Sequence, residues 1–448
     1  MNGIPGGLRT DQQPPMAIPL GHFVVAFAFL VAGAVGTTVI AVATVPGLSG
    51  VAHIHVVLLG WVGVTIMGAM TQFVPVWSGV TIHSRRLAIA QLWLVVTGLL
   101  GFVAVLLAGE LAWLPLAAAP ILLGLWLFVY NVGRTLAAAR PLDFTERHFA
   151  LALVCFALLA PLGYLLAVGF TRPVFDAIPV SRGDVLLVHA TLALFGAVLA
   201  TILGALRQLV PMFAQSELGG LDGRLLQIEQ ICFPIGLAAF VAGRGLGAEP
   251  LARIGAIGVL LGVAAFVLVL SRLLWNATAE RSPMTDRYWI IVASLSVWLS
   301  LTAPAWWLDP VGYDALFGHP DATVVLVVGV FGFVVVGSLY HIVPFIIWLE
   351  TYSDRLGFEQ VPMIDDLYDD RIERIDFALT LIGFVGLAAV SLFDLSPLVW
   401  IGASAIASTG FCAFVFNVFL TIHRHDPNGV LGVLGGAIGS NDEMVRPS

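Results

Sequence analysis

Residues 51–77 of the chain read VAHIHVVLLGWVGVTIMGAMTQFVPVW, a run that contains no Asp, Glu, Lys or Arg. A helix needs about 20 apolar residues to cross roughly 30 Å of hydrocarbon, so this run is long enough to span a bilayer. Stretches of similar length fill most of the remaining sequence. We therefore predict twelve transmembrane helices, near residues 19–45, 51–77, 86–108, 112–136, 148–170, 184–212, 226–245, 250–275, 288–308, 322–348, 375–394 and 397–422.

The composition indicates that lipid is the main solvent. Of 448 residues, 59% are hydrophobic and 11% are charged, which leaves too little polar surface to coat a water-soluble globule. The apolar stretches do not alternate in polarity as the strands of a transmembrane β-barrel do. We predict an all-α polytopic membrane protein in which residues 19–422 form a single twelve-helix domain. Residues 1–18 are predicted to be an N-terminal segment and residues 423–448 a flexible cytoplasmic tail.

Arginine alone sets the predicted orientation, because the chain contains no lysine. On the twelve-helix plan, one side carries Arg172, Arg182, Arg244 and Arg253. The other side carries Arg9, Arg85, Arg86, Arg134, Arg140, Arg147, Arg224, Arg272, Arg281, Arg287, Arg355, Arg371, Arg374, Arg424 and Arg446. Cytoplasmic loops carry the excess of basic residues, so both termini are predicted to be cytoplasmic. Arginine without lysine, with excess acid, is typical of halophiles, and we expect a multi-pass protein of a prokaryotic cell membrane. No basic patch indicates binding of nucleic acid.

Three of the predicted helices share one pattern of residues. Counted from its first residue, the pattern has Gly at +7 and +15, Gln or His at +19, and Pro at +22. It occurs as His53, Gly60, Gly68, Gln72 and Pro75; as His189, Gly196, Gly204, Gln208 and Pro211; and as Ala322, Gly329, Gly337, His341 and Pro344. The first residues are 136 and then 133 positions apart, which is four helices each time. We predict a threefold pseudo-repeat of four helices, over about residues 19–136, 148–275 and 288–422.

Three histidines, His53, His55 and His189, lie at one predicted depth in the outer part of apolar helices. An imidazole in hydrocarbon needs partners for both ring nitrogens, and heme iron can serve one while a backbone carbonyl serves the other. The alternative is an interfacial histidine that is hydrogen-bonded to a loop. Because the three share one depth, we favour ligation of heme iron. The three cysteines stand alone, which excludes a covalent C-x-x-C-H site, so the heme would be held noncovalently.

The spacing of His53 and His55 restricts how they bind. Residues i and i+2 of a helix differ by about 200° of rotation and about 3 Å of rise, so these two face opposite sides and do not ligate one iron together. One of them with His189 would give a six-coordinate heme, while the other, if a ligand, would hold a five-coordinate heme open to a small gas. Gly60 and Gly196 are candidates for a groove that a flat ligand approaches, although plain helix packing is the more common role of such glycines.

These residues resemble known families. The run HIHVVLLG at residues 53–60, continued through Gly68 to VPVWSG at residues 74–79, resembles the H-x-H…G…VPxWTG signature of the NnrS family. The run HATLALFG at residues 189–196 is similar to the later histidine-containing helix of that family. The plan also resembles subunit I of heme-copper oxidases and nitric oxide reductases, which has twelve core helices in three groups of four. The topological resemblance covers most of the chain, and the sequence resemblance is specific mainly in the second, sixth and tenth helices.

The chain departs from the oxidase pattern in where its histidines lie. In oxidase subunit I the tenth helix carries H-x-H, the second carries one His, and the sixth and seventh carry the copper ligands. Here H-x-H is on the second helix, and Ala322 and Val324 occupy those places in the tenth. The set looks rotated by one repeat, which implies a bis-histidine heme on His55 and His189. The resemblance then leaves no copper site, which argues against four-electron reduction of oxygen.

Other polar residues are predicted to be solvated or interfacial. The solvated histidines are His83, His148, His423 and His425, with His319 in an outer loop; His22 and His341 are assigned to the cytoplasmic interface. The acidic loop from Glu350 to Arg374, which includes Glu373, is predicted to be solvated rather than a docking site. With no lysine and few buried acids beyond Glu229, the chain is not predicted to pump protons.

One leading function and two alternatives follow. We predict a heme b protein that acts in electron transfer or in binding or reducing nitric oxide or oxygen. It would hold one or two hemes, and the residues do not support a copper site. A reductase with an open heme is its enzymatic version. Expected partners are the lipid bilayer and an electron-donor protein or partner subunit, with a homo-oligomer also open. A secondary transporter has similar repeats but usually carries intramembrane charge, which is nearly lacking here. A noncatalytic subunit that keeps the fold for assembly is the other alternative.

Overall fold

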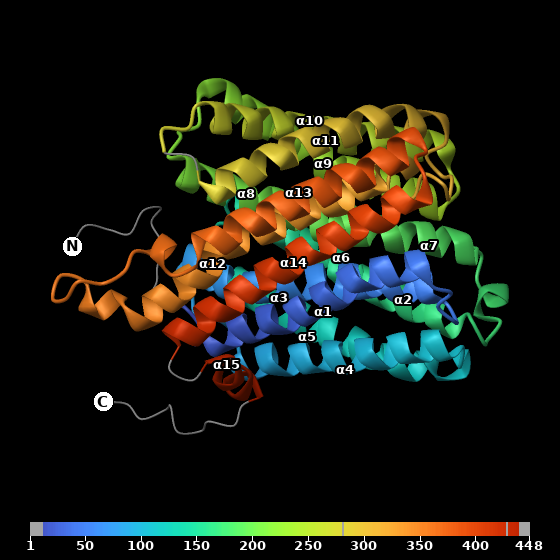
Figure 1. The fold of residues 1–448 in the computed structure, drawn as a ribbon. Helices are drawn as coiled ribbons and strands as arrows, with labels where there is room; N and C mark the ends of the chain where they lie inside the picture. Colours follow the sequence, from blue (N-terminus) through green and yellow to red (C-terminus); the bar gives the residue numbers. More distant parts are fainter. Residues whose placement is uncertain (1–11, 280–281, 427–428, 439–448) are drawn as a thin grey trace.

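The computed structural model describes residues 12–279, 282–426 and 429–438 of the chain. Within these residues, twelve helices are long and apolar enough to cross a membrane, which confirms the predicted number and the all-α class. The helices run alongside one another in one elongated bundle (Figure 1). The first helix, α1 (Ala17–Val42), begins at the same end of the bundle at which the last helix, α15 (Gly429–Ile438), lies.

Most spans are built on one long α-helix, whereas three are interrupted. The former are α1, α4 (Arg85–Ala108), α5 (Leu114–Ala138), α6 (Phe144–Val168), α9 (Gly220–Gly245), α10 (Glu249–Trp275), α11 (Pro283–Leu308), α13 (Asp370–Phe393) and α14 (Pro397–His425). The second span consists of α2 (Ser49–His55), η2 (Val56–Gly63) and α3 (Val64–Ser78). The sixth consists of α7 (Arg182–Thr191), η5 (Leu192–Leu199) and α8 (Ala200–Ala214), and the tenth contains η6 (Pro320–Ala322), η7 (Val325–Gly332) and α12 (Phe333–Thr351).

The interruptions are π-helical segments of eight residues in the same place of the repeated pattern. The segments η2, η5 and η7 begin three residues after His53, His189 and Ala322. A π-helix bonds residue i to i+5, is rare, and is frequently found at functional sites. The threefold pseudo-repeat of the whole chain stays a prediction, and the shared position of these segments supports it.

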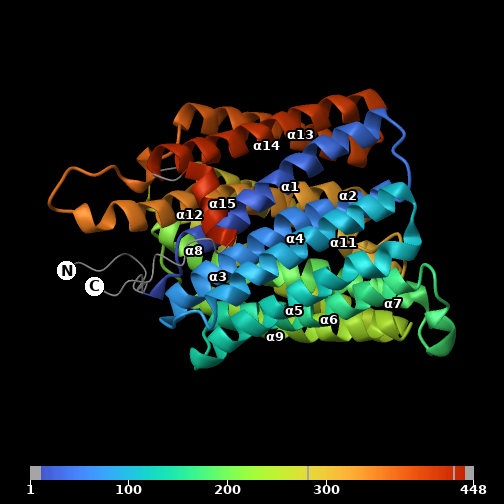
Figure 2. The same cartoon turned by 90° about the horizontal axis from the view of Figure 1, so that it is seen from below.

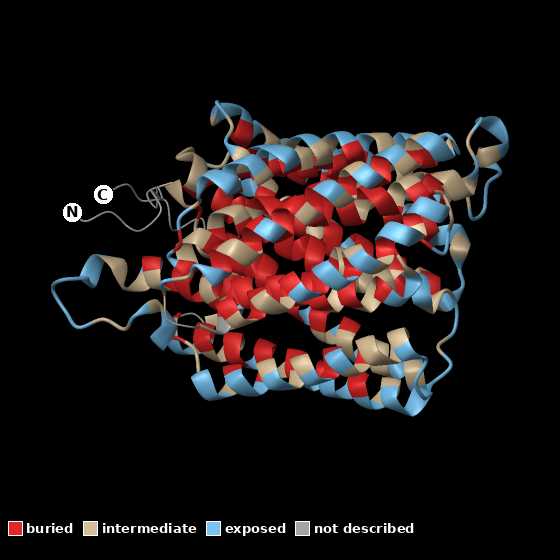
Figure 3. Cartoon of the chain, turned by 90° about the horizontal axis from the view of Figure 1, so that it is seen from above, coloured by how far each residue is buried: buried red, intermediate tan, exposed pale blue. Residues whose placement is uncertain are grey.

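The three interrupted spans form the centre of the bundle. In their windows, 61–78% of the residues are buried, against at most 56% in the other nine spans. Figure 3 shows buried residues concentrated between the helices and exposed residues on the outward faces. Large apolar side chains such as Leu116 and Ile235 lie on these outward faces, as expected where lipid is the solvent.

The end of the chain differs from the prediction of a flexible tail. Residues 429–438 form α15, which packs against α1 and α14 (Figure 2). Val433 in this helix is 2% exposed, so an apolar contact holds it against the bundle. Residues 439–448 of the predicted tail and 1–11 of the predicted N-terminal segment lie outside the described residues.

Polar caps start two helices earlier than hydropathy predicts. Helix α6 begins at Phe144, after a capping box formed by Asp143, and α13 follows the cap residue Asp369. Acidic residues are favourable at a helix start, because their oxygens accept from unpaired backbone N–H groups. A hydropathy scan leaves such charged turns outside the helix. As a result, Glu373, which was assigned to a solvated loop, lies in the first turn of a helix, and His148 lies in the second turn of another.

Candidate functional site

His55 is the last residue of α2, immediately before the π-helical segment η2. Its Nδ1 atom donates to the backbone carbonyl of Val51, one turn earlier, at 2.8 Å, and its ring packs against Phe102 with centroids 4.9 Å apart. Because a carbonyl oxygen only accepts, Nδ1 carries the proton and Nε2 keeps its lone pair. Among the described residues, Nε2 has no hydrogen-bond partner.

His189 occupies the corresponding region of the sixth span, in α7 and three residues before η5. Its Nδ1 atom donates to the backbone carbonyl of Leu159 in α6 at 2.9 Å. Gly163, one turn further along α6, lies so near the ring that a Cβ atom there would be 2.8 Å from Cε1 of His189. The imidazole is therefore held by a hydrogen bond and a close backbone, and its Nε2 finds no hydrogen-bond partner in the described chain.

His55 and His189 line the same cavity, which has a volume of about 410 Å³. Its walls come mainly from α2 and η2, α5, α6, and α7 and η5, and they are apolar, with Leu58, Leu122 and Leu194 among the lining residues. This volume lies in the usual range of ligand pockets, about 300–1,000 Å³. An apolar cavity with two imidazole lone pairs suits a large apolar ligand that takes nitrogen donors.

His53 faces away from this cavity, toward α1. Its Nε2 atom lies 2.9 Å from the backbone carbonyl of Gly33 and 3.1 Å from the hydroxyl of Thr37. The two histidines of the H-x-H pair thus have different neighbours, as their spacing predicts. Of the pair, it is His55 that shares a cavity with His189.

The two glycines proposed from the sequence as part of a ligand groove lie at helix interfaces instead. Gly60 packs against Phe29 of α1 and Gly196 against Cys155 of α6, so closely that a Cβ atom at either would clash. Neither is among the described residues that line the cavity. Gly63 does line it, at the end of η2. The structure therefore favours helix packing over a ligand groove for Gly60 and Gly196.

A buried arginine holds the loop beside the cavity. Arg244 is fully buried in α9 and donates to the backbone carbonyls of Pro310, Ala315 and Leu316 at 2.9, 2.9 and 3.2 Å. It also donates to the hydroxyl of Thr191, two residues after His189, at 2.7 Å. Leu316 lines the cavity. Arg244 therefore fixes the loop that bounds the cavity, a role that its predicted place at the outer side did not reveal.

Several side chains predicted to be solvated or interfacial are buried. His148 is 3% exposed, and its Nε2 atom lies 2.8 Å from Oε1 of Glu229, so the solvated assignment was wrong. Glu373 is 4% exposed and forms an ion pair with Arg287, which corrects its assignment to a solvated loop. His22 is fully buried. The partners in these two contacts are 81 and 86 positions apart, so no local pattern could have found them.

A scan against models of protein families finds no match to this chain, and a search of curated proteins finds none either.

Proposed function

We propose that the chain is an integral membrane heme b protein in which the Nε2 atoms of His55 and His189 bind one heme iron from opposite faces. The observation that carries the proposal is that both imidazoles line one apolar cavity. A metal-binding histidine usually donates its other ring N–H to a carbonyl or carboxylate, which fixes the tautomer and raises the basicity of the ligating nitrogen. Both rings make such a bond, to the carbonyls of Val51 and Leu159.

The residues around the two histidines also fit a noncovalent heme. The apolar walls match the apolar faces of a porphyrin, and the π-helical segments begin at the residue after His55 and three residues after His189.

The coordination we propose favours electron transfer. Bound heme would carry one electron by alternating between ferric and ferrous iron. Two protein ligands leave no open position for a gas, and His53 is turned toward Gly33 and Thr37 rather than into the cavity. We therefore favour electron transfer within the membrane over reduction of nitric oxide or oxygen. An electron-donor protein is the partner that this function requires.

The first test is the optical spectrum of the purified protein after expression with ample heme. We expect a Soret band and, after reduction, the sharp α-band of a six-coordinate b-type heme. Carbon monoxide should leave this spectrum unchanged, since both axial positions are occupied. A protein without a Soret band would overturn the proposal.

Variants then test the ligand pair. His55→Ala and His189→Ala should each give a five-coordinate heme that binds carbon monoxide, because one axial position opens. His53→Ala is the matched control, since it removes an imidazole at nearly the same depth that faces α1. A changed spectrum in His53→Ala with an unchanged one in His55→Ala would refute the pairing.

A further inference from the structure

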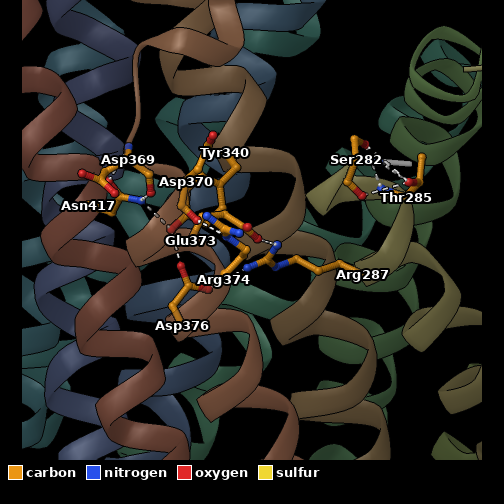
Figure 4. Close-up of polar contacts among 10 residues, drawn as sticks. All are labelled: Ser282, Thr285, Arg287, Tyr340, Asp369, Asp370, Glu373, Arg374, Asp376 and Asn417. Carbon is orange, nitrogen blue, oxygen red and sulfur yellow. Dashed lines mark hydrogen bonds and ion pairs between the residues drawn. The ribbon is translucent and has the colours of Figure 1, made fainter. Parts of the chain in front are cut away.

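Four helices enclose a group of buried polar side chains, which we call the carboxylate cluster. It consists of Arg287 from α11, Tyr340 from α12, Glu373 and Asp376 from α13, and Asn417 from α14 (Figure 4). Arg287 pairs with both acids: its Nη2 atom lies 2.6 Å from Oδ1 of Asp376, and its Nη1 atom contacts Glu373. The Tyr340 hydroxyl donates to Asp376 and accepts from Nδ2 of Asn417 at 3.1 Å.

The carboxylate cluster is buried and contains more acidic than basic groups. The exposed fraction is 1% for Arg287, 4% for Glu373 and 0% for Asp376. Two carboxylates face one guanidinium, so the ionised cluster has one negative charge in excess. A buried charge without a partner carries a large desolvation penalty, and the group takes up a proton instead.

The neighbouring groups do not supply the missing positive charge. Other titratable groups near the cluster are Tyr288 on α11, His341 on α12, Asp365 and Tyr368 before α13, and Asp369, Asp370, Arg371 and Arg374 at the start of α13. The Nδ1 atom of His341 lies 4.0 Å from Oδ1 of Asp365, so this histidine faces Asp365. Arg371 and Arg374 are exposed, and the Nε atom of Arg374 donates to the backbone carbonyl of Asp370. Within the described part of the chain, the only cation in an ion pair with Glu373 or Asp376 is Arg287.

We propose that the carboxylate cluster is a proton-binding site in which Glu373 and Asp376 together hold one exchangeable proton. With this proton the cluster contains one guanidinium, one carboxylate and one carboxylic acid, and it is neutral. The proton comes from water at the end of the bundle where α13 begins and returns there, so no electron is transferred. The proton belongs to the coupled pair rather than to one residue. This site does not depend on heme in the cavity of His55 and His189.

The structure provides a graded way into the cluster. Along α13, Asp370 is exposed, Glu373 is nearly buried and Asp376 is fully buried. Glu373 and Asp376 are three residues apart and so lie on one face of the helix. From the helix start, Nδ2 of Asn417 donates to the backbone carbonyl of Asp369 at 2.9 Å and also to Tyr340. Hydrogen bonds thus connect the start of α13 with Asp376.

Infrared spectroscopy of the full-length protein in lipid vesicles tests the site. At neutral pH we expect the C=O stretch of a protonated carboxylic acid, shifted when H₂O is replaced by D₂O. Asp376→Asn and Glu373→Gln should each lose the signal of one carboxylic acid, because the remaining carboxylate is neutralised by Arg287 alone. Glu110→Gln, at an exposed position outside the cluster, is the control that should keep it. An equal carboxylic acid signal in the wild type and both variants would overturn the proposal.

A stability measurement keeps the proposal testable if one variant does not fold. Each single amide variant removes the excess charge without a bound proton, so its melting temperature should stay close to that of the wild type. The double variant Glu373→Gln/Asp376→Asn leaves Arg287 buried without a counter-ion and should melt well below either single variant. Equal melting temperatures of the double and single variants would contradict the charge balance on which the site depends.

Discussion

Replacing Gly163 by alanine should weaken heme binding although both proposed ligands are kept. A Cβ atom at Gly163 would lie 2.8 Å from Cε1 of His189, and ordinary van der Waals contact begins at 3.4 Å, so the ring must retreat by about 0.6 Å. Metal sites tolerate ligand distances within about 0.2 Å. The same movement stretches the bond from Nδ1 to Leu159, and loss of such supporting contacts costs about 10- to 100-fold in metal affinity. That range corresponds to about 1.4–2.7 kcal/mol.

The assay is a heme titration of the heme-free protein, followed at the Soret band. We expect Gly163→Ala to bind heme about 10- to 100-fold more weakly than the wild type. Gly133→Ala is the control, because no atom lies within 4 Å of a Cβ at that position and the change is also a glycine replaced inside a helix. Equal affinity and an identical spectrum for Gly163→Ala and the wild type would show that the contact with His189 is irrelevant to binding.

Three more predictions concern residues outside the ligand pair. His53→Gln should leave the heme spectrum unchanged and lower the free energy of unfolding by about 1 kcal/mol, because its hydrogen bonds to α1 are weakened; a lost Soret band argues otherwise. His148→Leu should lower the free energy of unfolding by about 1–3 kcal/mol, since Glu229 is left buried without its hydrogen-bond partner, and a thermal melt equal to that of the wild type contradicts this. Arg244→Gln should speed heme release, measured by transfer to a heme scavenger, because the loop at Leu316 loses its anchor; an unchanged release rate excludes that role.

Hydropathy was sufficient to predict the number of spans because each is far more apolar than the loops between them. It did not reveal the π-helical segments. Residues 56–63, which read VVLLGWVG, are apolar all round the helix, so no polar residue marks a change from 3.6 residues per turn. It also misplaced the first turns of α6 and α13, where acidic caps that favour a helix start reduce the apolar signal.

For the candidate site, geometry within one helix was predictable and contacts between helices were not. The spacing of His53 and His55 places them on opposite faces whatever surrounds the helix. The repeated pattern predicted a common depth with His189. Which of the pair shares a cavity with His189 depends on how α2 sits beside α6 and α7, and this is set by packing between distant segments. The carboxylate cluster was missed for the same reason, because Arg287 and Asp376 are 89 positions apart.

The places that the predicted units share carry different chemistry. In each unit, one glycine packs on the following helix: Gly98, Gly236 and Gly383. The residue seven positions earlier is polar in each case, and these residues are Gln91, Glu229 and Asp376. The preceding helices place His22, His148 and Arg287 against Gly68, Gly204 and Gly337. The side chains at these places thus change from His22 and Gln91, through His148 in contact with Glu229, to Arg287 in contact with Asp376. The cavity histidines, in contrast, occur in the first two units. On the predicted repeat, the proposed electron and proton sites occupy different units, and α14 of the third unit packs directly against α1 of the first.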